Sequence, residues 1–282
     1  MMIEKRSRFC LVMAVFLAAL FVLGCNTGND DDDEPGVPNH YPGLDWSKIV
    51  DVDVTDSTVT LGTAARDIDA TGIRYGETAL GNLIVDGIAA YAEHVSGKPV
   101  DFAMLNGQNV QGLTTISAGV ITLTNLSSGL TDTLWIVTYT GSDIEKIINI
   151  FVNSSSSGRW NANCAVLVSK GVSYAIQPDT DASKPPRAVD IRLNGSPLDP
   201  KKDYRVAVGN FMAGRNGNSN DVPTSGGPSN FTNYGKDRES QYADENLKTA
   251  VAKYIAAKGT IEPVVEGRIK AAGVVPVIPA TP

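Results

Sequence analysis

Histidine and cysteine are scarce in this chain, and their scarcity limits the chemistry it can perform. The 282 residues include two histidines, His40 and His94, and three cysteines. A dinuclear metal site needs several such ligands, and no Cys/His cluster occurs here at metal-ligand spacing. No glycine loop of the Walker type is present. The sequence therefore predicts no catalytic residue, metal or cofactor, although paired carboxylates stay open because nothing singles out a pair.

Basic charge is scarce as well. Without residues 1–24 the chain has 21 Lys and Arg residues against 30 Asp and Glu residues, a formal net charge of −9. No basic stripe with interleaved aromatic residues is visible, and an acidic domain repels the phosphate backbone of a nucleic acid. Nucleic acid is therefore not expected as a partner.

The chain has a single long apolar run, the 13 residues 11–23. This run is too short for a membrane span, which needs about 20 residues, but it is typical of a signal peptide after a basic N-terminus. It ends in Val-Leu-Gly-Cys25, which looks like a bacterial lipobox. We therefore expect residues 1–24 to be a lipoprotein signal peptide and Cys25 to carry a lipid. The lipid would anchor the protein in the bacterial cell envelope, on the periplasmic face or the cell surface.

The remainder of the chain is expected to contain one folded domain. Residues 25–45 include the acidic run Asp30–Glu34 and predict a flexible tether, because like charges repel and few apolar residues are present. Residues 46–270 are long enough for one domain with a full core, and 271–282 predict an extended tail. Once Cys10 and Cys25 are accounted for, Cys164 is alone, which excludes an intrachain disulfide and favours a small buried residue in a strand.

Apolar periodicity predicts three helices, at about 77–94, from Ser142 to Phe151, and at about 244–259. Ser142 and Glu145 have the spacing of a capping box for the second helix. Strands are expected at 100–105, 134–139, 165–169, 188–193 and 205–208, and Asn194-Gly195 predicts a tight turn. The order of elements lacks a steady βαβ pattern, so the predicted class is α+β with mixed sheets and packed helices. His94 is expected to be a solvated cation at a helix C-terminus.

Several blocks of sequence, in order and at matching spacing, resemble the C-terminal, substrate-binding domain of the 5'-nucleotidase family. They cover about 200 residues, from the first to the last of the blocks Gly76–Asp86, Met104–Gly107, Ala118–Thr122, Thr140–Ile144, Leu193–Pro200, Tyr204–Ala207 and Glu266–Ile269. The resemblance implies the fold of that domain and a nucleoside or nucleotide ligand. In the family a separate N-terminal metallophosphoesterase domain performs the hydrolysis, so a separate chain of that kind is an implied partner.

The resemblance also implies ligand-binding positions, several of which are changed here. The family holds the base between two aromatic rings; one is kept as Phe211, and Leu130 stands in place of the other. The family's Asn-Gly-Gly-Gly-Ile-Arg loop keeps its asparagine as Asn106, whereas its arginine is replaced by Gln111. Asn216 stands in place of the ribose-binding aspartate. Loss of the arginine favours an uncharged ligand, because glutamine pairs weakly with phosphate.

Each of these positions also has a purely structural interpretation. Phe211 could belong to the core, Asn106 could cap a turn, and Gln111 and Asn216 could be ordinary loop residues. Arg74 lies two residues from where the family often has another arginine, so that role is not carried over. Three functions therefore stay open: a lipid-anchored nucleoside- or nucleotide-binding protein, the substrate-binding subunit of a split 5'-nucleotidase, and a scaffold lipoprotein without a ligand.

Overall fold

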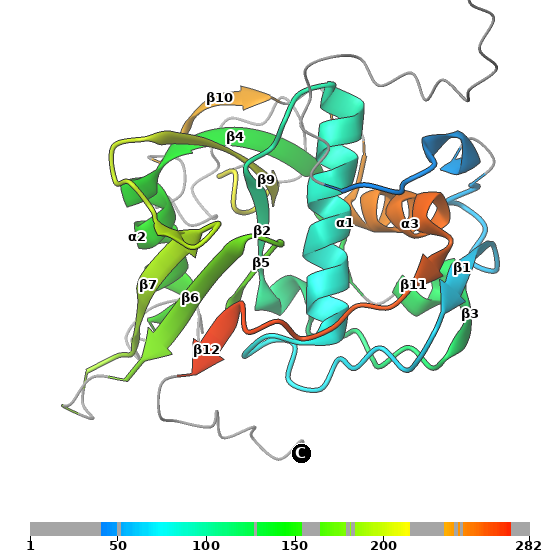
Figure 1. Cartoon of the computed structure of the whole chain (residues 1–282), viewed down its shortest axis with the longest axis horizontal. Helices are drawn as coiled ribbons and strands as arrows, with labels where there is room; N and C mark the ends of the chain where they lie inside the picture. The colour runs from blue at the N-terminus through cyan, green and yellow to red at the C-terminus, as the bar shows by residue number, and fades with distance from the viewer. Residues whose placement is uncertain are drawn as a thin grey trace, which may run out of the picture. The chain divides into compact units, whose positions relative to one another are not determined.

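The computed structural model describes residues 41–49, 52–126, 129–153, 164–178, 181, 184–214, 234–239, 242 and 245–271, without the side chain of Ala271. All of them belong to the compact unit Val37–Pro282. Several predictions fall on residues outside this described part. They are the expected signal peptide, Cys25, the acidic run, Asn216 and the tail from residue 272. Helices and strands mix in the described part, as Figure 1 shows, and the predicted α+β class is confirmed.

Three α-helices and three short 3-10 helices are present among the described residues. The helices are α1 (Ala79–Ser96), α2 (Gly141–Val152), α3 (Leu247–Lys258), η1 (Trp46–Ile49), η2 (Gly107–Val110) and η3 (Leu123–Leu126). The strands are β1 (Thr60–Ala64), β2 (Phe102–Asn106), β3 (Gly119–Thr122), β4 (Leu134–Thr140), β5 (Val166–Val168), β6 (Val172–Gln177), β7 (Arg187–Leu193), β8 (Ser196–Pro197), β9 (Asp203–Gly209), β10 (Lys236–Glu239), β11 (Thr260–Ile261) and β12 (Ile269–Ala271). They form sheets of order β11-β1-β3, β10-β4-β9-β2-β5 and β12-β6-β7-β8.

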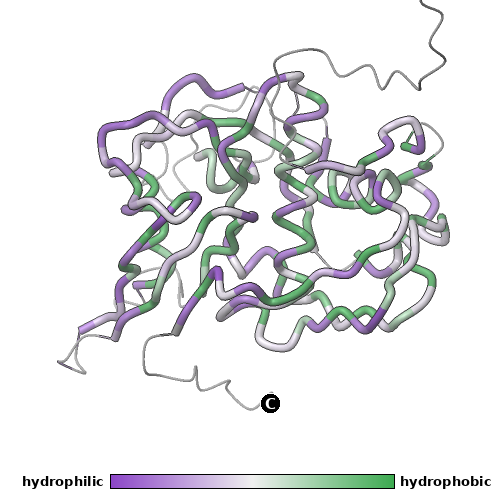
Figure 2. Tube along the Cα trace, in the orientation of Figure 1, coloured by the Kyte–Doolittle hydropathy of each residue, from purple (hydrophilic) through white to green (hydrophobic). Residues whose placement is uncertain are grey.

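The four apolar strands of the five-stranded sheet, β2, β4, β5 and β9, are buried between two hydrophobic clusters. Alternate residues of a strand point to opposite faces, and along β2 Ala103 and Leu105 join one hydrophobic cluster while Phe102 and Met104 join the other. The first cluster contains α1 and α3, and the second contains α2 with residues of β6 and β7. In Figure 1, α1 accordingly stands between the sheet and α3, and Figure 2 shows hydrophobic residues concentrated along these central elements.

Helix α1 begins and ends at well-defined caps. The Thr78 hydroxyl accepts a hydrogen bond from the Gly81 N–H at 3.0 Å, which satisfies one of the exposed donors of the first turn. Gly97 ends the helix in the left-handed region at φ 60°, where a side chain would be strained. Of its residues, 14 are buried, so α1 is a central helix of the core.

The capping box of α2 lies two residues before the predicted one. Thr140 is the N-cap, its hydroxyl accepts from the Asp143 N–H at 3.1 Å, and the Asp143 carboxylate accepts from the Thr140 N–H at 3.3 Å. The pair Ser142 and Glu145 is therefore not the cap. Gly141 explains the position of the turn, because a Cβ there would lie 2.1 Å from the Asp199 carbonyl oxygen.

The two smaller sheets depend on contacts between distant parts of the chain. β1 pairs with β3 antiparallel and with β11 parallel, and β12 pairs with β6 parallel. The predicted turn at Asn194-Gly195 is confirmed, since both residues have positive φ between β7 and β8. Tyr41 and Leu44 pack against the first cluster, so the packed region begins before residue 46.

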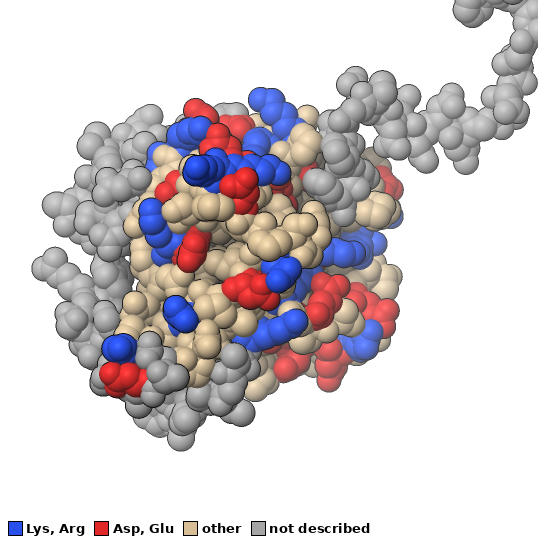
Figure 3. All heavy atoms as spheres, turned by 60° about the vertical axis from the view of Figure 1, so that its left-hand side comes forward, with Lys and Arg blue, Asp and Glu red and all other residues tan. Residues whose placement is uncertain are grey.

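Charged groups of both signs are mixed on the surface. On the face that Figure 3 turns forward, Lys and Arg lie beside Asp and Glu, with uncharged areas between them. Among the described residues no helix is long and apolar enough to cross a membrane.

Candidate functional site

The candidate site lies where β2 ends and η2 begins. Asn106, the last residue of β2, is 2% exposed, and its side-chain Oδ1 has no hydrogen-bond partner in the described part of the chain. Its side chain does not cap η2 either. A buried polar atom without a partner costs about 1–3 kcal/mol. The interpretation of Asn106 as a turn cap is therefore not supported, and its amide oxygen is left available to a ligand or water.

Arg74 is held beside this turn by backbone contacts. Its carbonyl accepts from the Ala165 N–H at 2.9 Å, and the Ala165 carbonyl accepts from the Gly107 N–H at 2.8 Å. Gly107 permits this arrangement, because a Cβ at this position would lie 2.4 Å from the Arg74 carbonyl oxygen. The loop before α1 is therefore fixed directly against the first residue of η2.

The Arg74 side chain lies beside position 111, where the resemblance implies an arginine. Its Nη1 donates to the Oε1 of Gln111 at 2.6 Å, so a guanidinium lies where the resemblance placed a cationic ligand contact. Gln111 is exposed at the end of η2. The uncharged residue at position 111 thus holds a cation, and the inference of an uncharged ligand no longer follows from position 111 alone.

Cys164 lies underneath this loop as a free thiol. It is 4% exposed and lies two residues before β5, outside the strand in which it was expected. Burial raises the pKa of the thiol to about 11, while the backbone N–H groups of Gln108 and Gly107 and the charge of Arg74 act in the opposite direction. The thiol is therefore protonated at neutral pH and is a poor nucleophile, which agrees with the predicted buried role.

A second group of polar residues connects η2 to the end of β9. Asn109 donates from Nδ2 to the Oδ2 of Asp132 at 2.8 Å, and the Phe211 N–H donates to the same oxygen at 3.4 Å. Gly209 gives the carboxylate room, since a Cβ there would lie 2.4 Å from Oδ2. Asn210 fixes the neighbouring backbone by accepting from the Thr133 N–H at 2.9 Å.

Asp132 is a carboxylate without a cationic partner among the described residues. Burial raises its pKa, and the hydrogen bonds from Asn109 and Phe211 only partly offset that effect. The Oδ1 atom accepts no hydrogen bond from the described residues. Asp132 therefore presents an acceptor beside Phe211. Sequence reasoning missed this residue, although it ends the stretch Gly129–Asp132 that was compared with the family's Pro-Phe-Gly-Asn segment.

Phe211 and Leu130 lie on different sides of this group. Phe211 is partly buried, and its ring lies 6.4 Å from the Phe151 ring, between centroids, at an interplanar angle of 51°. Leu130 is fully buried within the first hydrophobic cluster, at a positive φ of 62°. Leu130 thus has no exposed surface to offer to a ligand, and a larger ring there would overpack the core.

The structure brings four candidate positions into one region: Asn106, Gln111, Leu130 and Phe211 are linked through η2 and Asp132. Asn216 lies outside the described residues. Sequence reasoning missed the participation of Arg74 and Asp132, because both reach η2 through contacts between distant segments. No group of three or more His, Cys, Asp or Glu residues in the described part could hold a metal ion.

Comparisons with known proteins show relatives of this chain. The chain is 29% identical over 241 residues to the trifunctional nucleotide phosphoesterase protein YfkN of Bacillus subtilis, covering 83% of this chain and 15% of that protein. It is 30% identical over 151 residues to the protein UshA of Yersinia enterocolitica, covering 51% of this chain and 23% of that protein. The chain therefore spans a minor part of each of these relatives.

Solved structures show the same fold. A 5'-nucleotidase precursor from Thermus thermophilus superposes with a TM-score of 0.58 at 23% identity, covering 77% of this chain and 40% of that one. The sulfate thiohydrolase SoxB from the same organism superposes with a TM-score of 0.54 at 16% identity, covering 78% and 36%. A sequence model of the family described as "5'-nucleotidase, C-terminal domain" matches residues 54–222. The chain belongs to the 5'-nucleotidase C-terminal domain family.

Proposed function

We propose that this protein is a lipid-anchored binding protein for a nucleoside or nucleotide. The observation that carries the proposal is the unpartnered Oδ1 of buried Asn106, at the turn where Gly107 packs against the Arg74 backbone and the Arg74 guanidinium bonds to Gln111. An amide oxygen suits a sugar hydroxyl or a base N–H, and a guanidinium suits a phosphate. A partly buried ring, Phe211, supplies a surface for stacking a base.

The chemistry of the site favours a ligand with hydrogen-bond donors near the ring. Asp132 presents a carboxylate next to Phe211, and an acceptor there matches the N–H groups on the edge of a nucleobase. At the other end, Arg74 and Gln111 suit the sugar or phosphate. Phe211 with Asp132 would therefore contact the base, while Asn106 and Arg74 would contact the sugar and any phosphate.

Calorimetry on the full chain with guanosine, adenosine and their 5'-monophosphates tests this proposal. Phe211→Leu retains an apolar side chain but removes the stacking ring, so it should weaken binding by about 1–3 kcal/mol, about 5- to 150-fold. Phe151→Leu is the matched control, because it removes a ring of the same size from the buried side of the contact. Equal losses in the two variants would indicate a packing effect and count against a stacked base.

Arg74→Gln provides the second arm of the test. It should weaken binding of the monophosphates and leave binding of the nucleosides nearly unchanged, because only the phosphate uses the positive charge. If no nucleoside or nucleotide binds the unmodified chain, the proposal fails and the scaffold function becomes the better explanation.

A split enzyme is the second candidate. The chain covers 40% of a solved 5'-nucleotidase precursor and 15% of a nucleotide phosphoesterase, so relatives carry additional parts. In that case a separate metallophosphoesterase chain would dock onto this domain. The full chain alone should not release phosphate from 5'-nucleotides with added divalent metal, whereas a copurified partner would confer chelator-sensitive release. Chelator-sensitive release by the chain alone would refute both candidates.

Anchoring depends on Cys25, the last residue of the lipobox-like Val-Leu-Gly-Cys. A lipid at this position would hold the chain on a membrane. Cys25→Ser should therefore abolish incorporation of labelled fatty acid and release the chain from the membrane fraction, whereas Cys10→Ser should change neither. Continued labelling of the Cys25→Ser protein would contradict the lipobox interpretation.

A further inference from the structure

A cavity of about 460 Å³ lies between the N-terminal half of α1, the end of α3 and residues 260–268. Tyr41, Pro42 and Leu44 also line it, and it shares no residue with the candidate nucleoside site. Its volume falls within the range of small-molecule sites, about 300–1,000 Å³.

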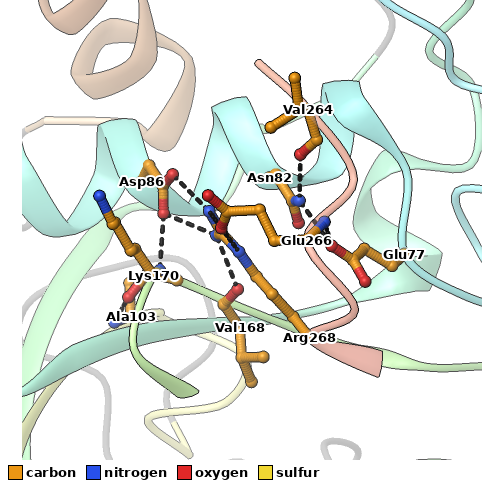
Figure 4. Close-up of polar contacts among 10 residues, drawn as sticks. Glu77, Asn82, Asp86, Ala103, Val168, Lys170, Val264, Glu266 and Arg268 are labelled. Carbon is orange, nitrogen blue, oxygen red and sulfur yellow. Dashed lines mark hydrogen bonds and ion pairs between the residues drawn. The ribbon is translucent and has the colours of Figure 1, made fainter. Parts of the chain in front are cut away.

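The carboxylates that line this cavity are already paired with arginines. Asp86 accepts two hydrogen bonds from the guanidinium of Arg268, at 2.7 and 2.8 Å, and Glu266 lies 2.7 Å from the same guanidinium. Figure 4 shows this arrangement at the start of β12. Glu262 pairs with Arg66 at 2.6 Å. The acidic side chains are thus engaged within the protein and are not free to bind a cation.

Two lysines line the same cavity without such partners. Neither Lys170 nor Lys258 forms an ion pair with a carboxylate in the described part of the chain, although the Lys258 ammonium lies 5.8 Å from the Tyr254 ring centroid. In Figure 4 the Lys170 ammonium lies on the far side of Asp86 from Arg268. The charged lining residues are balanced in sign, and Arg66, the partner of Glu262, brings the sum to one positive charge. The two lysines are the cations of this group that are free to meet a ligand.

Apolar and hydroxyl groups complete the cavity. Leu83 and Pro263 contribute to its wall, and Val264, another lining residue, is 43% exposed despite its size. Burial raises the pKa of the Tyr254 hydroxyl, which therefore stays protonated and able to donate a hydrogen bond. Free cations, a hydroxyl donor and exposed apolar surface are the features that bind an organic anion.

We propose that this cavity binds a small organic carboxylate with an apolar body, held by Lys170 and Lys258 through its charge and by the wall around Val264 through its body. The site is independent of nucleoside binding. The ligand would enter as the anion, because a carboxylate next to an ammonium group remains ionised.

A series of three probes that share one ring system but differ in charge tests the proposal. Indole-3-acetate is an anion, indole-3-acetamide is neutral and tryptamine is a cation. Calorimetry on the full chain should show indole-3-acetate binding at least tenfold more tightly than the amide and more tightly still than tryptamine. Equal binding of the anion and the amide, or no binding of the anion, would overturn the proposal.

Variants locate the binding. The double variant Lys170→Met, Lys258→Met should remove the preference of the anion over the amide, whereas Lys146→Met, Lys201→Met alters two exposed lysines away from the cavity and should keep it. If the cavity variant kept the preference, the anion would be binding elsewhere. Phe211→Leu should leave anion binding unchanged, so failure of the nucleoside proposal and failure of this one are distinguishable.

Discussion

The strongest prediction for stability concerns the ion pair between Asp86 of α1 and Arg268, next to β12. The Arg268 side chain is 6% exposed, and the two hydrogen bonds it donates to Asp86 join the C-terminal segment to the central helix. Asp86 also accepts from the Lys170 N–H at 2.8 Å. Asp86→Leu would therefore leave a nearly buried guanidinium with Glu266 as its remaining carboxylate partner.

The expected cost follows from the burial of the pair. Removing one partner of a buried ion pair typically costs about 3–5 kcal/mol, because the other charge stays buried without compensation. Glu266, whose side chain is 38% exposed, keeps part of the compensation, so we expect the lower end, about 3 kcal/mol. For a domain of this size that corresponds to a fall in Tm of about 6–12 °C.

Thermal denaturation of the full chain, followed by circular dichroism, measures this loss. Glu262→Leu is the matched control: its ion pair with Arg66 is 2.6 Å long, but the two side chains are 54% and 57% exposed, so the loss should stay below about 1 kcal/mol. The double variant Asp86→Leu, Arg268→Met should recover much of the stability, because the carboxylate left without a partner, Glu266, is 38% exposed and no buried charge stays unpaired. A loss for Asp86→Leu no larger than for Glu262→Leu would refute the reasoning.

Three further changes have definite expected outcomes. Asp132→Asn should raise the free energy of unfolding at pH 7 but hardly at pH 4. Burial raises the pKa of the Asp132 carboxyl, so the cost of burying its charge appears only above the ordinary carboxyl pKa of about 3.9. Equal gains in urea titrations at both pH values would contradict this. Gly107→Ala should cost about 1–3 kcal/mol in thermal denaturation, because its Cβ would lie 2.4 Å from the Arg74 carbonyl oxygen; an unchanged Tm would show that the loop yields easily. Burial and Lys253 lower the pKa of His94, so its contribution to stability is present above about pH 6.5 and is lost as the pH falls below that value. His94→Gln should therefore reduce the loss of unfolding free energy between pH 7 and pH 5. An identical pH profile of stability in the two proteins would argue against this.

Local patterns predicted the helices well because their information is contained within a few turns. The helix expected at 77–94 is α1, Ala79–Ser96, and the third helix ends at Lys258, directly before the expected Gly259. Four strands of the five-stranded sheet, β2, β4, β5 and β9, were predicted because they are apolar and buried, whereas the polar edge strand β10 was not predicted. β1 and β11 were missed, because short segments such as Thr60–Ala64 become strands only through pairing with distant partners.

The N-cap of α2 and the residue His94 show where local patterns are insufficient. Both Thr140 with Asp143 and Ser142 with Glu145 have capping-box spacing, and the close approach of Gly141 to Asp199 favours the first pair. His94 lies exposed in the last turn of α1, as expected, but its ring stacks on Trp46 at 4.2 Å between centroids, and desolvation and Lys253 lower its pKa, which disfavours the expected positive charge. In both cases a residue far along the chain decides the outcome, and the local sequence contains no trace of it.

The same limit applies to the charge of the candidate site. Gln111 alone indicates a lost arginine, yet the site keeps a guanidinium because Arg74, 37 residues earlier, donates to Gln111 at 2.6 Å. Leu130 alone indicates a lost aromatic face, and there the structure offers no replacement, because the side chain is buried in the core. The proposed site would therefore offer a guanidinium to a phosphate and one ring for stacking. Its stacking of a base should depend on Phe211 alone, whereas its preference for a nucleotide over a nucleoside should depend on Arg74.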